Sequence, residues 1–243
     1  MLGIFFVHGG VYMSVVAILV DGGFYRKRAR YLFGEKSASE RANELIKYCN
    51  AHLKDKDGGT KRDLYRIFYY DCPPYDKSVF HPLLKKNINL KKTDLYTWSN
   101  EFLNQLKSKR KVALRLGLLS DVTARYQLTK ETQMKLFRNQ IQLEDISEEN
   151  FELYIEQKGV DMKIGLDIAS MAYKKQVNQI ILISADSDFV PAAKLARREG
   201  IDFILDPMWS TIKPELYEHI DGLQSQRIQE KQTKKDSHNE LCD

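Results

Sequence analysis

Three short apolar runs in this chain each end near an aspartate, and stretches of helical length lie between them. The runs and their aspartates are 15–20 with Asp21, 180–184 with Asp186, and 203–205 with Asp206. Runs of this length that are rich in β-branched residues are typical of strands buried on both faces. Short strands that alternate with helices form right-handed βαβ units, which build a parallel sheet. The pattern therefore predicts an α/β fold around a parallel sheet.

The same reasoning assigns elements to most of the chain. Strands are expected at residues 15–20, 64–70, 112–116, 179–184 and 202–205, and helices at 38–53, 100–109, 161–175 and 191–199. The turn residues of segment 54–59 predict a loop. The basic stretch between Pro74 and Asn100 is expected to be poor in regular structure, and residues 121–150 are expected to form a polar insertion with some helix.

A chain of 243 residues is long enough for one well-buried domain with an insertion and a tail. We expect this domain at residues 14–222, with the insertion around 73–150. Residues 1–13 are expected to be an N-terminal extension, since Met13 is a candidate start with residues 1–12 before it. The polar residues 223–243 are expected to be a disordered tail. The first twenty residues carry no charged side chain, but glycine, serine and histidine interrupt them, so we expect no membrane span or signal peptide.

Charge and cysteine content place mild limits on function. The formal net charge of +5 permits an anionic partner without requiring one. The three cysteines, Cys49, Cys72 and Cys242, lie far apart, which excludes a zinc ribbon and predicts no disulfide framework. A reducing compartment, the cytoplasm, is therefore the expected location.

Several acidic residues fall where a parallel sheet binds its ligands, beyond the carboxyl ends of the strands. Asp21, Asp186 and Asp188 follow predicted strands, and Asp161 opens a predicted helix. Helical spacing puts residues 161, 165, 168 and 172 on one small and apolar face, so we expect Asp161 at the end of the inward face. The alternative for each residue alone is structural: Asp161 and Asp188 as helix caps, and Asp21 as a turn residue.

A group of carboxylates is chemically informative because like charges repel and need a proton or a cation to compensate. Oxygen ligands select hard ions such as Mg²⁺ or Mn²⁺, and such ions can activate water for phosphoryl displacement. None of the five histidines has zinc-ligand spacing. The residue types thus favour a divalent-metal site for phosphate chemistry.

Three segments of the chain, taken together, resemble the NYN domain family, the LabA-like branch of the PIN-like nucleases. These segments are Val20-Asp21-Gly22-Gly23-Phe24, Lys158-Gly159-Val160-Asp161, and Ser184-Ala185-Asp186-Ser187-Asp188-Phe189. The likeness covers residues 14–72 and 156–207. It implies a PIN-like, Rossmannoid parallel sheet with helices on both faces, and a ribonuclease site that uses Mg²⁺ or Mn²⁺.

The resemblance also implies roles for individual residues. The catalytic and metal-binding residues would be Asp21, Asp161, Asp186 and Asp188, with Ser184 as a polar neighbour at the substrate and Lys158 as a phosphate contact. The family often has asparagine three residues after the first aspartate, where this chain has Phe24. A catalytically silent RNA-binding or regulatory adaptor with the same fold therefore stays open as the alternative. A phosphatase of the haloacid-dehalogenase type is disfavoured, because Gly23 stands where its second aspartate would be.

Basic residues outside these segments are further candidates for contacts with phosphates, above all Lys91 and Lys92. Others are Arg26, Lys27, Arg28, Lys85, Lys86, Lys109, Arg110 and Lys111, and Tyr75, Tyr96 and Trp98 could stack on unpaired bases. Solvated lysines and core aromatics are the alternative. The expected partner is RNA, single-stranded or structured, with no membrane; whether copies of the chain form a homo-oligomer is left open.

Overall fold

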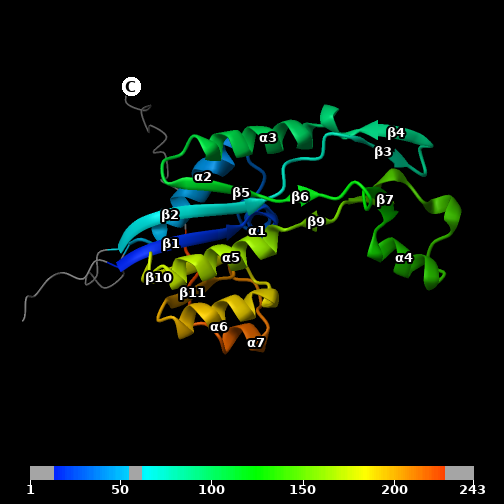
Figure 1. The fold of residues 1–243 in the computed structure, drawn as a ribbon. Helices are drawn as coiled ribbons and strands as arrows, with labels where there is room; N and C mark the ends of the chain where they lie inside the picture. The colour runs from blue at the N-terminus through cyan, green and yellow to red at the C-terminus, as the bar shows by residue number, and fades with distance from the viewer. Residues whose placement is uncertain (1–13, 55–61, 228–243) are drawn as a thin grey trace, which may run out of the picture.

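The computed structural model describes residues 14–54 and 62–227, and its centre is a six-stranded sheet (Figure 1). The strands lie in the order β12-β11-β10-β1-β2-β5, and every neighbouring pair is parallel. Their bounds are β1 Ser14–Asp21, β2 Arg62–Asp71, β5 Val112–Leu116, β10 Gln179–Ile183, β11 Asp202–Asp206 and β12 Gly222–Leu223. The predicted α/β fold with a parallel sheet is confirmed.

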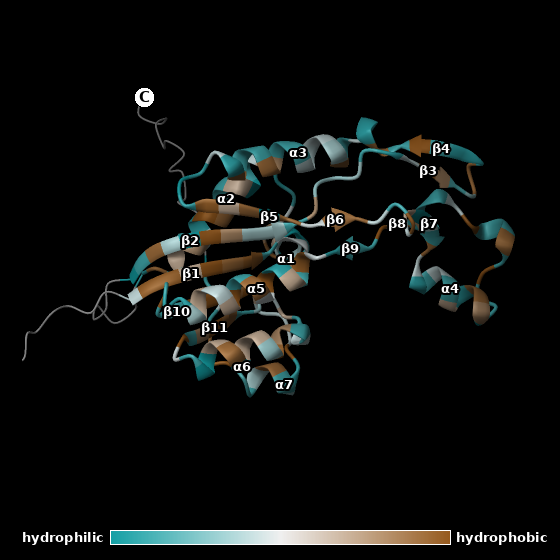
Figure 2. Cartoon of the chain, in the orientation of Figure 1, coloured by the Kyte–Doolittle hydropathy of each residue, from teal (hydrophilic) through white to brown (hydrophobic). Residues whose placement is uncertain are grey.

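Helices cover both faces of this sheet. One face carries α1 (Gly22–Phe33), α2 (Ala38–Ala51) and α3 (Asp94–Lys107); the other carries α5 (Val160–Tyr173), α6 (Val190–Arg198) and α7 (Pro214–Tyr217). Side chains of β1 alternate between the two layers: Val16, Ile18 and Val20 pack on the α1–α3 side, and Ala17 and Leu19 on the α5–α7 side. Figure 2 shows the resulting hydrophobic central strands and the more hydrophilic outer surfaces.

Two segments between β2 and α5, one before α3 and one after β5, build an arm that extends past the carboxyl end of the sheet (Figure 1). Its strands are β3 (Ser78–His81), β4 (Lys86–Asn89), β6 (Leu118–Leu119), β7 (Arg125–Leu128), β8 (Phe151–Tyr154) and β9 (Gln157–Lys158), with helix α4 (Lys130–Phe137) and short 3-10 turns η1 (Leu90–Lys92), η2 (Leu143–Asp145) and η3 (Glu148–Asn150). His81 is buried at its centre, with its ring 4.5 Å from that of Tyr126 and 4.9 Å from that of Phe151. The arm thus has a small aromatic core.

Several expectations for individual segments differ from the structure. The basic stretch before residue 100 is not poor in structure, because it holds the β3–β4 hairpin, and α3 begins at Asp94 behind a Thr93 N-cap. Helix α1 was not expected at all. The tail does not begin at residue 223, since Leu223 belongs to β12 and Gln226 is buried. The predictions for residues 1–13, for most of the loop at 54–59, and for residues 228–243 lie outside the described residues.

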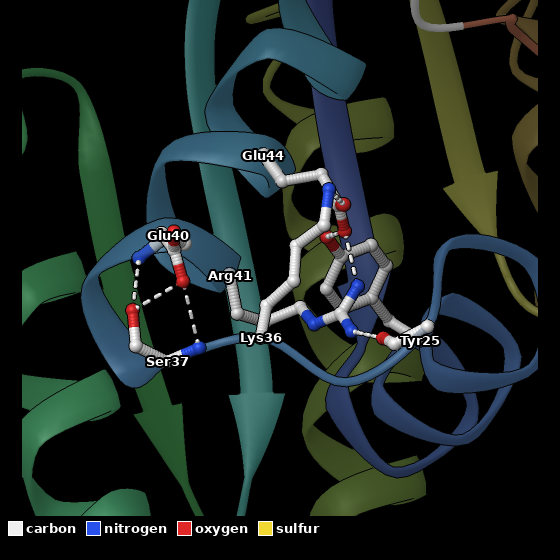
Figure 3. A network of polar contacts seen from close by, with 7 residues as sticks. Tyr25, Lys36, Ser37, Glu40, Arg41 and Glu44 are labelled. Atoms are coloured by element: carbon white, nitrogen blue, oxygen red, sulfur yellow. Dashed lines mark hydrogen bonds and ion pairs between the residues drawn. The ribbon is translucent and has the colours of Figure 1, made fainter. Parts of the chain in front are cut away.

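A buried polar network joins α1 to α2 (Figure 3). The Tyr25 hydroxyl donates to Glu44 Oε1 at 3.2 Å, Lys36 Nζ lies 2.7 Å from Glu44 Oε2, and the Arg41 guanidinium pairs with the same carboxylate. Burial, and next the charge of Glu44, raise the pKa of Tyr25 well above its ordinary value, so its proton stays available for this bond. Two cations compensate one buried acid, which fixes the link between the two helices.

In residues 14–54 and 62–227, no helix is long and apolar enough to cross a membrane. Cys49 and Cys72 are both buried and free.

Candidate functional site: an acidic cluster at the carboxyl edge of the sheet

Asp21 lies at the junction of β1 and α1, where it is the last strand residue and the N-cap of the helix. Its Oδ1 accepts a hydrogen bond from the Phe24 amide at 3.1 Å, and its Oδ2 accepts one from the Ser184 hydroxyl at 3.2 Å. The next residue must be glycine, because a Cβ at Gly22 would lie 2.6 Å from the Tyr69 ring. The close approach of α1 to β2 therefore holds the Asp21 carboxylate in one orientation.

Asp161 lies in the first turn of α5, after Gly159, which has φ 79° and is the N-cap. Its carboxylate is exposed, and no donor of the described residues bonds to it. Asp161 and Asp188 line the same open hollow between α5 and α6, with Phe189 and Pro191 at its floor and rim. Asp161 thus faces the loop that follows β10.

The loop after β10 carries the other two carboxylates. Asp186 caps the 3-10 turn η4 (Ser187–Phe189), where its Oδ1 accepts from the Asp188 amide at 3.0 Å. The Asp186 amide in turn donates to the Ser184 hydroxyl at 3.3 Å. Ser184 is fully buried, so it links Asp21 to this loop and positions both, which differs from the predicted contact with substrate.

Asp161 lies within electrostatic reach of the other three carboxylates. The pKa of Asp21 is raised, first by burial and further by the charges of Asp161 and Asp71, against the lowering effect of its hydrogen bonds. The pKa of Asp161 is raised by burial and then by Asp186 and Asp188. Across the described residues, no lysine or arginine is within ion-pair distance of any of the four. No ion pair of the described residues therefore offsets the repulsion between these carboxylates, although the charge of Arg26 acts on Asp21 from a longer distance.

The capping roles fall on other aspartates than those to which the structural alternative in the sequence assigned them. Asp21 and Asp186 accept capping hydrogen bonds, whereas Asp161 and Asp188 do not. The buried residues of α5 are Val160, Ile164, Ile168, Met171 and Ala172. Ile168 and Ala172 of the predicted inward face are therefore buried, whereas Asp161 is exposed at the edge of that face and is accessible to a ligand.

The donor set of the cluster fits a hard divalent cation, since it consists of carboxylate oxygens. Over residues 14–54 and 62–227, no three His, Cys, Asp or Glu side chains are close enough to hold one metal together. Mg²⁺ commonly binds through only one or two carboxylates and keeps several waters. Asp161 and Asp188 meet that requirement, because neither carboxylate is engaged by a donor.

Two further aspartates end strands at the same edge but face the opposite helix layer. Asp71 ends β2 and is buried, where it accepts from Arg26 at 3.0 Å, Tyr69 at 3.0 Å and the Cys72 amide at 2.8 Å. Sequence reasoning missed this residue, because the strand was taken to end at Tyr70. Asp206 ends β11 and lies 2.8 Å from His52 Nε2, with both side chains fully buried. Neither belongs to the cluster.

The predicted basic contacts are spread over the arm and its base. Lys158 is exposed on β9, 3.9 Å from Glu156, three residues before Asp161. Lys91 and Lys92 are exposed on η1, at the base of the β3–β4 hairpin. Some other candidates have structural partners instead: Arg28 donates to Met208 O, Lys109 to Asn43 and Trp98 to Lys36 O. Phe24 packs on the core of the α1–α3 layer.

Comparison with known proteins adds three findings. A family model described as "NYN domain" matches residues 86–215, more than half of the 243 residues and a range that includes Asp161, Asp186 and Asp188. No curated protein matches the sequence significantly. A similar solved structure is a protein of unknown function from Vibrio parahaemolyticus RIMD 2210633, with 14% identity, a TM-score of 0.45, and coverage of 88% of this chain and 93% of that one.

Proposed function

Because the chain belongs to the NYN domain family of PIN-like nucleases, we propose that it is a divalent-metal-dependent ribonuclease that hydrolyses RNA phosphodiester bonds. The observation that carries this proposal is the acidic cluster. Asp21, Asp161, Asp186 and Asp188 come from three separate parts of the chain. After burial, the charge of Asp161 raises the pKa of Asp21, and the charges of Asp186 and Asp188 raise the pKa of Asp161. None of the four has an ion-pair partner among the described residues. A cluster of this kind is stored electrostatic repulsion, which a bound cation relieves.

The chain's own residues would divide the work at this site. Asp161 and Asp188 would hold Mg²⁺ or Mn²⁺, since their oxygens are free of donors. Asp21, fixed by the Phe24 amide and the Ser184 hydroxyl, would orient the attacking water, and Asp186 would keep the loop and Asp188 in place. A bound divalent ion would supply Lewis acidity and a more acidic water.

Positive side chains near the edge would bind the RNA backbone. Lys158 ends β9, three residues before Asp161, and we assign it the phosphate beside the bond that is cut. Lys91 and Lys92 on η1 would contact phosphates farther along a single-stranded or structured RNA. The two free buried cysteines support placing this reaction in the cytoplasm.

A catalytically silent RNA-binding or regulatory adaptor is the second candidate. Two observations favour it: Asp21 and Asp186 are already engaged as caps, and no three ligand side chains of the described residues meet at one point. Phe24 adds to this, because it places an apolar side chain where the family often has asparagine.

Cleavage assays with matched variants separate the two candidates. Purified protein is incubated with labelled RNA and labelled DNA, in Mn²⁺, Mg²⁺ or EDTA. We expect RNA cleavage that requires metal, that is lost in Asp161→Asn, and that persists in Asp167→Asn. Asp167 is a suitable control because it lies on the same helix but is bonded to Tyr70 and Arg115. Absence of metal-dependent cleavage, or full activity of Asp161→Asn, would favour the adaptor.

A further inference from the structure

A pocket at the base of the arm lies on the α1–α3 side of the sheet edge, outside the acidic cluster. Its walls come from α3, from the segment that leaves β2, and from the segments around β6 and β9, elements that Figure 1 labels. Tyr75, Tyr96 and Phe102 contribute aromatic side chains, and Leu90 and Leu103 contribute aliphatic ones. The pocket is thus largely apolar.

The volume of the pocket is about 160 Å³. A protein cavity of roughly 150 Å³ accommodates one benzene molecule. The volume therefore matches one six-membered ring and is small for the two fused rings of a purine. Half-buried Tyr96 offers a ring face against which a planar ligand can stack.

The closed end of the pocket is polar. Arg26 and Asp71 line it, and they are joined by a hydrogen bond of 3.0 Å. The Arg26 Nε is buried, and among the described residues it has no hydrogen-bond partner. An unpaired buried donor is costly, and a ligand with a carbonyl oxygen would satisfy it. The Asp71 carboxylate already accepts three bonds, so it serves mainly to hold the guanidinium in place.

The pocket borders the acidic cluster across two neighbouring strands. Asp21 on β1 is paired in register with Tyr70 on β2, and Asp71 is the next residue. Neighbouring strands lie about 4.8 Å apart. Arg26 is on α1, the helix that Asp21 caps. A nucleotide with its phosphate at the cluster can therefore reach the pocket with a base near the same strand ends.

We propose that this pocket binds one unpaired pyrimidine base of the RNA, with Arg26 Nε donating to a ring carbonyl and Tyr96 stacking on the ring. This inference rests on the proposed function in that the ligand is RNA held at the acidic cluster. Uracil and cytosine both offer a ring carbonyl on a single six-membered ring. Adenine offers neither feature, so the pocket gives the protein a preference for pyrimidine-containing single strands.

Binding in EDTA tests the pocket separately from cleavage. Fluorescence anisotropy would measure the affinity of the full chain for short oligouridylate and oligoadenylate at one fixed salt concentration. Ser99 is buried on α3 and lines the pocket, so Ser99→Leu fills it. Thr97→Leu is the matched control, because Thr97 is exposed on the same helix and does not line the pocket. Thermal melts confirm that both variants are folded.

We expect the wild type and Thr97→Leu to bind oligouridylate more tightly than oligoadenylate, and Ser99→Leu to lose this preference. Tyr96→Ala should weaken oligouridylate binding by roughly five- to hundredfold, the range for loss of one base–aromatic stack. Equal affinity of the wild type for both strands, no RNA binding, or a preference that survives in Ser99→Leu would overturn the inference.

The outcomes distinguish this inference from the proposed function. Metal-dependent cleavage without any pyrimidine preference would support the proposed ribonuclease function and refute the base-binding role of the pocket. A pyrimidine preference that Ser99→Leu abolishes, in a protein that does not cleave RNA, would support the base-binding role and refute the ribonuclease function.

Discussion

Replacing Asp21 with asparagine separates a ligand role from a capping role. Asparagine caps helices about as well as aspartate, so the hydrogen bond from the Phe24 amide is kept while the charge is removed. Burial, and then the charges of Asp161 and Asp71, raise the pKa of Asp21 above its ordinary value of 3.8. The charged form is therefore disfavoured in the folded protein. We expect Asp21→Asn to be more stable than the wild type at neutral pH in EDTA.

The pH dependence of this difference follows from the direction of the pKa shift. Between pH 3.8 and the raised folded pKa, the folded wild type binds more protons than the unfolded chain. Its free energy of unfolding therefore falls as pH rises through that window and stays lower above it. The advantage of Asp21→Asn should be absent below pH 3.8, should grow through the window, and should then stay constant.

The alanine variant supplies the magnitude of the capping contribution. Asp21→Ala also removes the charge, but it removes the cap as well, which costs about 1 kcal/mol. For a chain of this size, 1 kcal/mol corresponds to about 2–4 °C in Tm. Asp21→Asn should therefore melt about 2–4 °C above Asp21→Ala under every condition without metal.

Metal completes the test. At a Mn²⁺ concentration a hundred times Kd, binding stabilises the wild type by about 2.7 kcal/mol. Both variants should lose all cleavage and part of this gain, because the charge of Asp21 beside Asp161 adds to the attraction for an ion held by Asp161 and Asp188. Thermal melts of the three proteins across pH, each in EDTA and in Mn²⁺, measure every quantity. If Asp21→Asn melts below the wild type in EDTA and keeps the full Mn²⁺ response, Asp21 is only a cap, and the assigned mechanism is wrong.

Three other predictions concern residues around the site. Gly22→Ala should lower the free energy of unfolding by about 1–3 kcal/mol, because a Cβ at this position meets Tyr69 at 2.6 Å. Gly165→Ala on α5, where a Cβ has nothing within 4 Å, should raise it by about 0.5–1 kcal/mol. Urea unfolding of both variants measures the two changes. Asp206→Ala should lower the free energy of unfolding by about 3 kcal/mol, because it leaves His52, the Met208 amide and Ser225 without their hydrogen-bond acceptor. The rate of cleavage per folded molecule should stay unchanged, and a lower rate would place Asp206 in the site. The affinity for single-stranded RNA should fall with salt with a log–log slope near −0.7 per phosphate contact, and Lys91→Ala with Lys92→Ala should flatten that slope; an affinity that ignores salt would point to a partner other than nucleic acid.

The strands that are buried on both faces could be predicted, because the apolar pattern and the length of each run both indicate a strand. The runs at 15–20 and 179–184 became β1 and β10, which lie at the centre of the sheet and are buried over residues 16–20 and 179–183. Helix α1 was not found, because two glycines and a run of basic residues hide its apolar side. Its signal is Tyr25 and Ala29, four residues apart and both buried. The Asp21 cap gives the other half of that signal.

The arm could not be predicted from periodicity, since its stability depends on contacts between distant segments. β3 pairs with β4 locally, but β6 pairs with β9 and β7 with β8 across an insertion. The buried His81 lies against Tyr126 and Phe151, which are far away in the sequence. Strands of two to four residues carry too little alternation to be recognised in isolation.

The site was predictable at the level of the sheet edge, but the edge has two faces, and strand parity decides which carboxylates meet. Side chains alternate along a strand. Asp21 therefore shares the face of Ala17 and Leu19, and Ser184 shares the face of Ile180 and Leu182, both toward α5 and Asp161.

Asp71 lies on the same face of β2 as Ile67 and Tyr69, and Asp206 lies on the same face of β11 as Ile204. Both carboxylates therefore point toward the α1–α3 layer. Counting residues back from each strand end would have sorted these carboxylates from the sequence alone. The same count places Asp71 with Arg26 at the closed end of the pocket. One sheet edge thus presents an unpaired acidic cluster on one face and a paired acid and base on the other. Under the proposed function, that division would let a single nucleotide meet a cation through its phosphate and a hydrogen-bond donor through its base.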